Sequence, residues 1–503
     1  MGVFKTMLTT AASLSALALA APAFAQEAPT VDAGDQPTAA NVEEVVVTAS
    51  PIGVSEKAMT ANVDALDDVK LASAPSVSLG DLVSGLPGVR SSSFAPGASR
   101  PVIRGLSGPR VQVLTNGLGM IDASAVSDDH SVAVDPSEAE RIEVVRGPNT
   151  LAFGGSAIGG VVNVIDGRIA ETPAENGLEG RIGVQGSTVD TGWAANARLK
   201  AGSGPWVATL QAARRETDDY AIPGPAMSQR LADALGVPRT GPDVVENSFT
   251  QLTEYGGGLS YVGDTGFAGV GLKQTESHYG TVAEPDVTIQ LRQTRTDVRA
   301  EKDLDGGPFA RVKASAGYAD YKHTEFEGPD PGTVFTSTGW EGRLELVQRK
   351  VGDWQGAVGL QTFSRDISAQ GDEVLFPAAE TQQYSLYTVQ RIDHGPIGVE
   401  AGVRVEKVEV NSVIADRSFT NVSGSAGLFL RPVTGLYLGL SAARFERAPN
   451  EVELFANGPH PATAQYQVGD PTFSPEVANS LELAIHYELN AWSADLQIGR
   501  AHV

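Results

Sequence analysis

A glycine-rich stretch between two β-branched runs, within residues 140–169, constrains the fold of this chain more than any other segment. The runs Ile142 to Val145 and Val161 to Ile165 predict two short strands. The glycines between them are Gly147, Gly154, Gly155, Gly159 and Gly160. Because glycine adopts positive φ and allows close backbone approach, the chain can fold back tightly here, as in a glycine-rich turn of an α+β domain. A nucleotide-binding loop does not fit, since neither Gly-Lys-Ser/Thr nor a long helix follows.

The first 25 residues read as a secretory signal peptide. Lys5 supplies a basic start, Ala11 to Ala21 is apolar, and residues 23–25 form a small-x-small cleavage site. The residues that follow, up to about 53, are rich in Ala, Pro, Asp and Thr and predict a flexible tail. We therefore expect a mature protein that starts at Gln26 and leaves the cytoplasm.

From about residue 179 onward, apolar and polar residues alternate. In the clearest example the aliphatic residues Val399, Ala401, Val403 and Val405 are interleaved with Glu400, Arg404 and Glu406. A period of two places alternate side chains on opposite faces of a sheet. Charged residues inside and aliphatic residues outside are typical of a transmembrane barrel, although a soluble β-sandwich uses the inverted pattern. Beyond the N-terminus we find no apolar run of about 18 residues, so a membrane-spanning helix is not expected.

The turns between the predicted strands alternate in length. Short turns are expected at residues 394–396 and 431–435, on the periplasmic side of a barrel. Longer polar segments at residues 217–246 and 364–382 predict extracellular loops, and Ser228 to Leu235 predicts a short helix in the first of them.

Composition excludes some classes of function. The chain has no cysteine, so it has neither disulfides nor thiolate metal sites. A net charge of −24 argues against a nucleic-acid partner. No Ser/His/Asp set with inward strand placement is evident, so we expect no enzymatic activity.

The glycine-rich stretch resembles the end of the plug domain in TonB-dependent outer-membrane receptors. Its residues match that family's two fixed-spacing motifs at Arg141, Glu143, Arg146, Gly147 and Pro148, and then at Gly154, Ala157, Gly159, Gly160, Val161, Asn163 and Val164. Further family motifs occur in the expected order at residues 79–89, 101–106 and 110–117. The resemblance implies an α+β plug, residues 54–170, inside an all-β transmembrane antiparallel β-barrel, residues 171–503. Barrels of the family have about 22 strands, so we expect this one to be C-terminally truncated.

The resemblance also implies how the receptor is driven and where it resides. The run Glu43, Glu44, Val45, Val46, Val47, Thr48 and Ala49 resembles a TonB box, to which TonB, energised by ExbB-ExbD, would pair through main-chain hydrogen bonds. The alternative for this run is the first strand of the plug. In the family, plug Arg and Glu residues pair with the barrel wall, which points to Arg104, Arg141, Glu143 and Arg146. The implied location is the bacterial outer membrane, in contact with its lipid.

Three histidine-containing segments are candidates for metal binding. They supply Asp129 and His130, then His323, Glu325 and Glu327 on one face of a strand, and finally His460. Nitrogen and oxygen ligands suit Zn²⁺. From spacing alone, a solvated loop explains Asp129 and His130 better than a metal site does, and a polar barrel lumen also explains the strand residues. The segments resemble the zinc-uptake (ZnuD-like) branch of the family, but this chain lacks its long His-rich loop and has Asn457 where a His is common.

The sequence therefore predicts TonB-dependent active uptake of zinc, or a related divalent metal ion, with no cofactor required. The resemblance implies that the ligands are Asp129, His130, His460 and one of Glu325 and Glu327. An organic metal chelate such as a metallophore, haem or cobalamin is the alternative cargo. A passive porin or an adhesin is disfavoured, because neither needs a plug or a TonB box.

Overall fold

The computed structural model describes residues 48, 50–53, 60, 63–73, 77–371, 374–489 and 492–502. The predicted signal peptide, most of the predicted tail, and the TonB-box residues other than Thr48 lie outside the described residues. Within the described part, no helix has both the length and the apolar character needed to cross a bilayer.

The plug is built on a small mixed sheet with the strand order β1-β6-β7-β4-β5. Its strands are β1 (Val63–Asp67), β4 (Val111–Thr115), β5 (Leu118–Gly119), β6 (Arg141–Val145) and β7 (Gly160–Ile165). β4 and β7 pair in parallel, and the other neighbours are antiparallel. The two strands predicted from β-branched runs are confirmed as β6 and β7, whose valines are buried in the plug core.

The glycine-rich segment between β6 and β7 forms two 3₁₀ turns, Gly147–Phe153 and Gly155–Ala157. Gly147 and Gly154 have φ of 70° and 102°, which only glycine adopts without strain. A Cβ on Gly155 would lie 2.3 Å from the carbonyl oxygen of Glu446 in the barrel. The glycines therefore let the plug backbone turn and also touch the barrel wall.

Two short helices and a hairpin complete the plug. The helices are α1 (Asp68–Ser73) and α2 (Leu79–Val83), and the hairpin joins β2 (Val89–Ser91) to β3 (Pro101–Ile103). Ser78 caps α2 by accepting a hydrogen bond from the Asp81 amide. The motif at residues 79–89 therefore begins with a capped helix.

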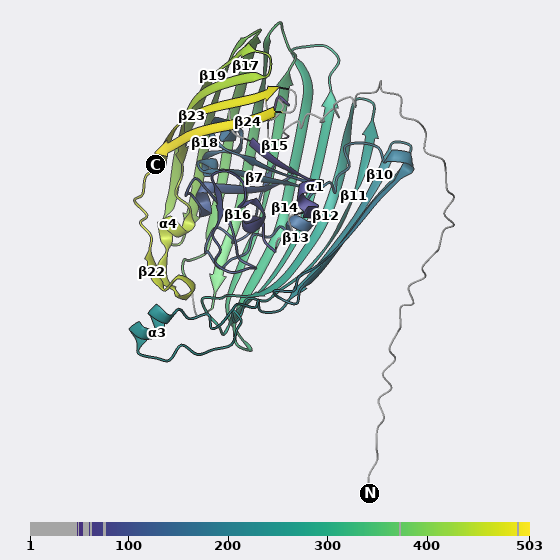
Figure 1. The fold of residues 1–503 in the computed structure, drawn as a ribbon. Coiled ribbons are helices and arrows are strands. Elements are labelled where there is room, and N and C mark those ends of the chain that lie inside the picture. Colours follow the sequence, from purple (N-terminus) through teal and green to yellow (C-terminus); the bar gives the residue numbers. More distant parts are fainter. Residues whose placement is uncertain are drawn as a thin grey trace, which may run out of the picture. The chain divides into compact units, whose positions relative to one another are not determined.

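After the plug, 15 strands of the described residues form one antiparallel sheet (Figure 1). They are β8 (Leu178–Gly186), β9 (Trp193–Ser203), β10 (Trp206–Thr217), β11 (Thr250–Gly263), β12 (Gly266–Gly280), β13 (Val287–Asp303), β14 (Phe309–Glu327), β15 (Asp330–Gln348), β16 (Trp354–Gln370), β17 (Ala379–His394), β18 (Ile397–Ser412), β19 (Asp416–Val433), β20 (Leu436–Arg447), β23 (Glu476–Leu489) and β24 (Trp492–His502). Each strand pairs with the next one in this list, so β20 lies beside β23. The predicted fold class, an α+β plug with an antiparallel barrel sheet, is confirmed.

The two faces of this sheet differ as the alternation predicts. In β18, Val399, Val403 and Val405 are exposed, whereas Arg404 and Glu406 are buried on the opposite face. The buried face meets the plug, so its charged residues find partners there and on neighbouring strands.

The connections between strands match the sequence in part. A long loop between β10 and β11 carries α3 (Gln229–Leu235), which confirms that prediction. The predicted loop at residues 364–382 is wrong, because β16 continues to Gln370 and β17 begins at Ala379. Arg365 and Ile367 occupy inward strand positions, where Arg365 pairs with Glu451 of α4 (Glu451–Phe455). Polar lumen residues of this kind are easily mistaken for a loop.

A buried ionic network fastens the end of the plug to the wall. Arg168 donates to Asp166 at 2.7 Å and to Asp297 of β13 at 2.8 Å. Asp297 also accepts from Arg295 at 2.9 Å, and all four side chains are almost completely buried. The neutralised charges hold residues 166–168 against β13.

Candidate metal site

Asp129 and His130 lie on the plug loop between β5 and β6, which is held in shape by its own polar contacts. The Asp122 carboxylate accepts from the Ser124 amide at 3.1 Å and from the Ala133 amide at 3.2 Å. The phenol oxygen of Tyr279, from barrel strand β12, donates to the carbonyl of Asp129 at 3.1 Å. The loop therefore presents its side chains to the wall from a fixed backbone.

His130 is buried and faces the barrel. Its Nδ1 lies 3.0 Å from the carbonyl oxygen of Ala123, and its Nε2 lies 3.1 Å from Oε1 of Glu325. A carbonyl only accepts, so Nδ1 carries a hydrogen and Nε2 offers its lone pair in the neutral ring. Two acceptors then face each other, and they need a proton or a cation between them. Burial lowers the pKa of His130, but the carboxylates of Asp129 and Glu325 outweigh that effect and the pKa is raised.

His323 stands beside His130 on strand β14. The two ring centroids are 4.3 Å apart, and Phe335 packs against both rings. Nδ1 of His323 is 2.7 Å from the hydroxyl of Tyr321, and its Nε2 is 3.6 Å from Oε1 of Glu325. That Nε2 is buried and has no hydrogen-bond partner among the described residues. A buried, unpaired imidazole nitrogen is uncommon unless the site has another use for it.

Glu325 joins the two histidines, whereas Glu327 does not. Ligand atoms of His130, His323 and Glu325 all lie within 4.8 Å of one another. The pairing of β14 with β15 shifts register between Thr324 and Phe326, next to Glu325. Glu327 lines the same small cavity but lies outside this three-residue cluster.

His460 approaches from the other side of Asp129. It ends the short strand β21 (Asn457–His460), which pairs with β22 (Gln465–Val468). Its Nε2 is 2.5 Å from the hydroxyl of Ser127 and 3.8 Å from Oδ1 of Asp129. Burial raises the pKa of Asp129 and lowers that of His460. Asp129 therefore lies between His460 and His130, whose Nε2 is 3.9 Å from its Oδ2.

The space among these side chains is small. The cavity has a volume of about 20 Å³ and is lined by residues that include Asp129, His130, Glu325, Glu327 and His460. Such a volume holds one atom or water molecule. The structure thus brings His130, His323 and Glu325 to within 4.8 Å of one another, and Asp129, Glu327 and His460 line the cavity beside them. Imidazole nitrogens and carboxylate oxygens of this kind fit a Zn²⁺-sized cation.

Two nearby residues were missed by sequence reasoning. Tyr279 binds the plug loop from β12, and Glu284 lines the cavity from the β12–β13 connection. Burial, followed by the negative charges of Asp129, Glu325 and Glu327, raises the pKa of Glu284 to about 7. No local motif marks either residue, because their role depends on which strand faces the plug loop.

The residues predicted to join plug and wall have different partners. Arg104 pairs with Glu482 of barrel strand β23. Among the other three, Arg141 pairs with Glu143, and Arg146 pairs with Asp64 and the Pro87 carbonyl of the plug, while the charge of Glu482 in the barrel also acts on Arg146.

Thr48, from the predicted TonB box, contacts the plug sheet. Its amide and hydroxyl donate to the two carboxylate oxygens of Glu143 at 2.9 and 2.8 Å. Glu143 is fully buried and stands on β6. Thr48, one residue of the predicted box, is therefore held to the plug by a carboxylate.

Comparison with known proteins gives matches along both parts of the chain. The family model "TonB-dependent Receptor Plug Domain" matches residues 55–161, and "TonB dependent receptor-like, beta-barrel" matches residues 173–497. The vitamin B12 transporter BtuB of Photobacterium profundum is 27% identical over 186 residues, covering 35% of this chain and 30% of that protein. The ferric enterobactin receptor PirA of Pseudomonas aeruginosa is 37% identical over 110 residues, covering 18% and 14%.

Among solved structures, the copper transporter OprC is similar, with a TM-score of 0.73 and 16% identity over 91% of this chain and 72% of that one. At that identity the likeness shows the fold. The matched stretches amount to 30% or less of the length of either curated relative.

Proposed function

Because this chain belongs to the family of TonB-dependent receptors, which lie in the outer membrane, we propose that it takes up a divalent metal ion by TonB-dependent transport. Zinc is the ion that we propose as its main cargo. The family consists of receptors and transporters rather than enzymes. Membership of the zinc-uptake branch stays a prediction.

One observation carries the proposal: His130 of the plug and His323 and Glu325 of the barrel converge on a common point. Nε2 of His130 and Oε1 of Glu325 face each other and need a proton or a cation between them, and Nε2 of His323 is buried without a hydrogen-bond partner among the described residues. A cation among these atoms would satisfy all of them at once. Asp129 and His460 complete a set of nitrogen and oxygen donors around it.

The donor set favours zinc over softer or harder ions. Zn²⁺ binds imidazole and carboxylate in four-coordinate sites at about 2.0–2.2 Å, which suits a site of this size. Ca²⁺ and Mg²⁺ prefer oxygen ligands alone, and Cu(I) prefers thiolate or thioether. Cu²⁺ shares the imidazole preference and binds most sites more tightly, so it is the competitor to measure.

The size of the cavity argues against a large chelate at this point. A volume of about 20 Å³ admits a bare ion and excludes haem, cobalamin or a metallophore. The vitamin B12 and enterobactin receptors among the relatives keep a chelate as the alternative cargo, which would bind elsewhere in the lumen.

Division of the ligands between two parts suggests how the ion is released. Asp129 and His130 belong to the plug, whereas His323 and Glu325 belong to the wall. A pull by TonB on the predicted TonB box, which includes Thr48, would move the plug relative to the wall. The coordination sphere then comes apart without unfolding the barrel.

Uptake of radioactive zinc by cells that express the receptor tests the proposal. We expect uptake that needs TonB and falls at least about tenfold in the double variant His130→Ala/His323→Ala. His486→Ala is the matched control, because His486 pairs with Asp495 on strands β23 and β24, outside the metal cavity. Equal uptake by the double variant and the control would refute the proposed site.

A further inference from the structure

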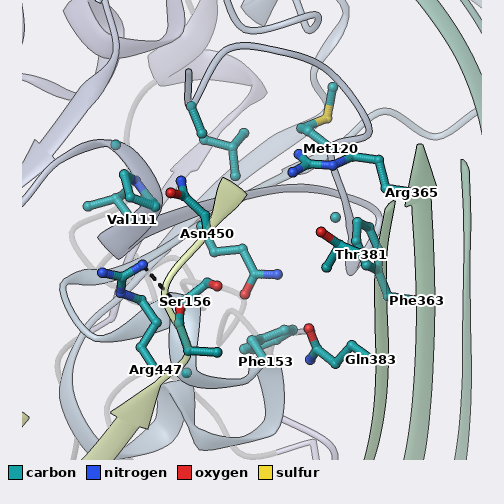
Figure 2. A pocket seen from close by; sticks show the side chains of 18 of the residues that line it. Val111, Met120, Phe153, Ser156, Phe363, Arg365, Thr381, Gln383, Arg447 and Asn450 are labelled. Atoms are coloured by element: carbon teal, nitrogen blue, oxygen red, sulfur yellow. Dashed lines mark hydrogen bonds between the residues drawn. The ribbon is translucent and has the colours of Figure 1, made fainter. Parts of the chain in front are cut away.

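A second, larger cavity lies between the plug and barrel strands β15–β18. Its volume is about 200 Å³, and its lining includes Asp122, Ser124, Glu341, Thr381 and Glu406. Figure 2 shows plug residues Val111 and Ser156 across this space from Phe363, Thr381 and Gln383 of the barrel. The volume is enough for several water molecules. We call this space the inner cavity.

One plug loop separates the inner cavity from the metal site. Asp122, Ser124 and Ala125 line the inner cavity, while Val126 and Ser127 line the metal cavity. Ala123 lies between them and accepts a hydrogen bond from His130 through its carbonyl. Residues 122–127 therefore form a partition one peptide strand thick.

Arg100 holds the partition in place from within the inner cavity. Its guanidinium donates to the carbonyl of Ser124, within the partition, and to the carboxylate of Asp128, the residue that follows it. The side chain is only 9% exposed, and its Nε is buried without a partner among the described residues. An unpaired buried donor weakens the grip, because part of the desolvation cost stays uncompensated.

The inner cavity is lined by carboxylates and by the guanidinium groups of Arg100, Arg365 and Arg447, so it offers polar groups to the water around a cation. Unpaired buried polar atoms at its wall, counted over the described residues, are Nε of Arg100, Oε1 of Gln112, Nε of Arg365 and Oγ1 of Thr381. Its carboxylates already accept hydrogen bonds from the protein, as Glu341 does from the Gly119 amide at 2.7 Å and Glu451 from Arg365 at 2.7 Å. Occupied carboxylates attract a cation without replacing its water, so they do not trap it.

Where the plug meets strands β11 and β13, buried ion pairs and close backbone packing hold its end against the wall. There, Arg168 forms its buried pairs with Asp166 and Asp297, and a Cβ on Gly258 would lie 2.2 Å from the carbonyl oxygen of Arg168. Opening a path on that side would break buried ion pairs, whereas the inner cavity already exists.

We propose that the inner cavity is the compartment that receives the metal ion when residues 122–127 move, and that Arg100 is the positioning residue that keeps the partition closed. This inference rests on the proposed uptake function. It adds the direction in which the ion leaves its ligands, along strands β15–β18.

Filling the inner cavity tests this directly. Thr381→Trp adds bulk at a residue whose hydroxyl has no partner in the described structure, so no hydrogen bond is lost. Gln382→Trp is the matched control, because the neighbouring side chain points to the other face of β17. Zinc affinity is measured by calorimetry on the purified full chain, and uptake is measured with radioactive zinc in cells.

We expect Thr381→Trp to bind zinc within about threefold of wild type but to lose at least about tenfold in uptake, whereas Gln382→Trp keeps both. If the Trp variant does not fold, Thr381→Phe replaces it, with the same expected zinc affinity and the same expected loss of uptake. Uptake by a folded Thr381 variant equal to that of Gln382→Trp would overturn the inference alone. Wild-type cells that take up no zinc would contradict the proposed function, and the inference with it.

Discussion

Nε2 of His130 lies 3.1 Å from Oε1 of Glu325, although the two residues are 195 positions apart and belong to different parts of the fold. The contact joins the plug to the wall at one point. Anything that binds there links the position of the plug to the presence of a ligand.

Replacing Glu325 and Glu327 one at a time tests which of the two carboxylates binds the ion. Glu325→Gln should weaken zinc binding at least about tenfold, because Glu325 is within reach of both His130 and His323. Glu327→Gln, two residues on, should stay within about threefold, since it only lines the cavity. Calorimetric titration of both variants measures the difference, and equal losses would contradict the assignment of Glu325.

A reversible tether tests whether transport requires the start of the plug to move. A Cβ on Gly439 of β20 would lie 3.6 Å from Cβ of Thr60, within the range that a disulfide bridges. The natural chain has no cysteine, so Thr60→Cys/Gly439→Cys introduces the only pair. We expect the oxidised variant to bind zinc normally and to stop transporting it, and reductant to restore uptake.

The control tether is Ala174→Cys/Gly202→Cys. A Cβ on Gly202 would lie 3.2 Å from Cβ of Ala174, and neither residue belongs to the plug. Its oxidation should leave uptake unchanged. Transport through the oxidised Thr60–Gly439 variant would show that this part of the plug stays in place during uptake.

Local pattern was enough to predict strands β6 and β7 and the alternating faces of the barrel strands, whereas the arrangement of a plug in a barrel came from the family resemblance. The β-branched runs of β6 and β7 need no distant partner to be recognised, and the alternation in β18 specifies its two faces. Thr48 was assigned from sequence to a predicted TonB box. Its hydrogen bonds to Glu143 could not be predicted, because the two residues are 95 positions apart and only the fold brings them together.

The candidate site could be predicted in composition but not in detail. Asp129, His130, His323 and His460 were identified from segments that resemble a family. The choice between Glu325 and Glu327 was open, because both share a face in a regular strand, and the register shift at Thr324 to Phe326 is a tertiary feature. Tyr279 was missed because its strand position looks like any other lumen residue.

The ionic network at the end of the plug predicts an acid-sensitive anchor. Burial raises the pKa of Asp166, but Arg168, Lys273 and the hydrogen bonds from Asn116 and the Arg168 amide outweigh it and hold the pKa well below its usual range. A lowered pKa gives stability that is full above the unfolded value of about 3.9 and lost as pH falls below it. The unfolding midpoint of wild type should therefore approach that of Asp166→Asn on acidification from pH 5 toward pH 2.5. A constant difference between the two midpoints over that range would contradict this.

The glycine-rich turn is packed closely against the barrel, so adding one methyl group at Gly155 should destabilise the folded protein. Gly155→Ala places a Cβ 2.3 Å from the Glu446 carbonyl, and overpacking of this kind costs about 1–3 kcal/mol. Gly85→Ala is the control, since nothing lies within 4 Å of its added Cβ. Limited proteolysis of the plug should be faster for the first variant than for the second. Equal rates would show that the turn does not seat against β20.

The central claim is that one metal ion is held jointly by the plug and the wall. A crystal of the receptor soaked in zinc, with an anomalous difference map collected at the zinc edge, tests it most directly. The account predicts one strong peak at about 2.0–2.2 Å from Nε2 of His130 and from Oε1 of Glu325. A map with no peak among these side chains, or with its peak bound to residues of the plug alone, would contradict it.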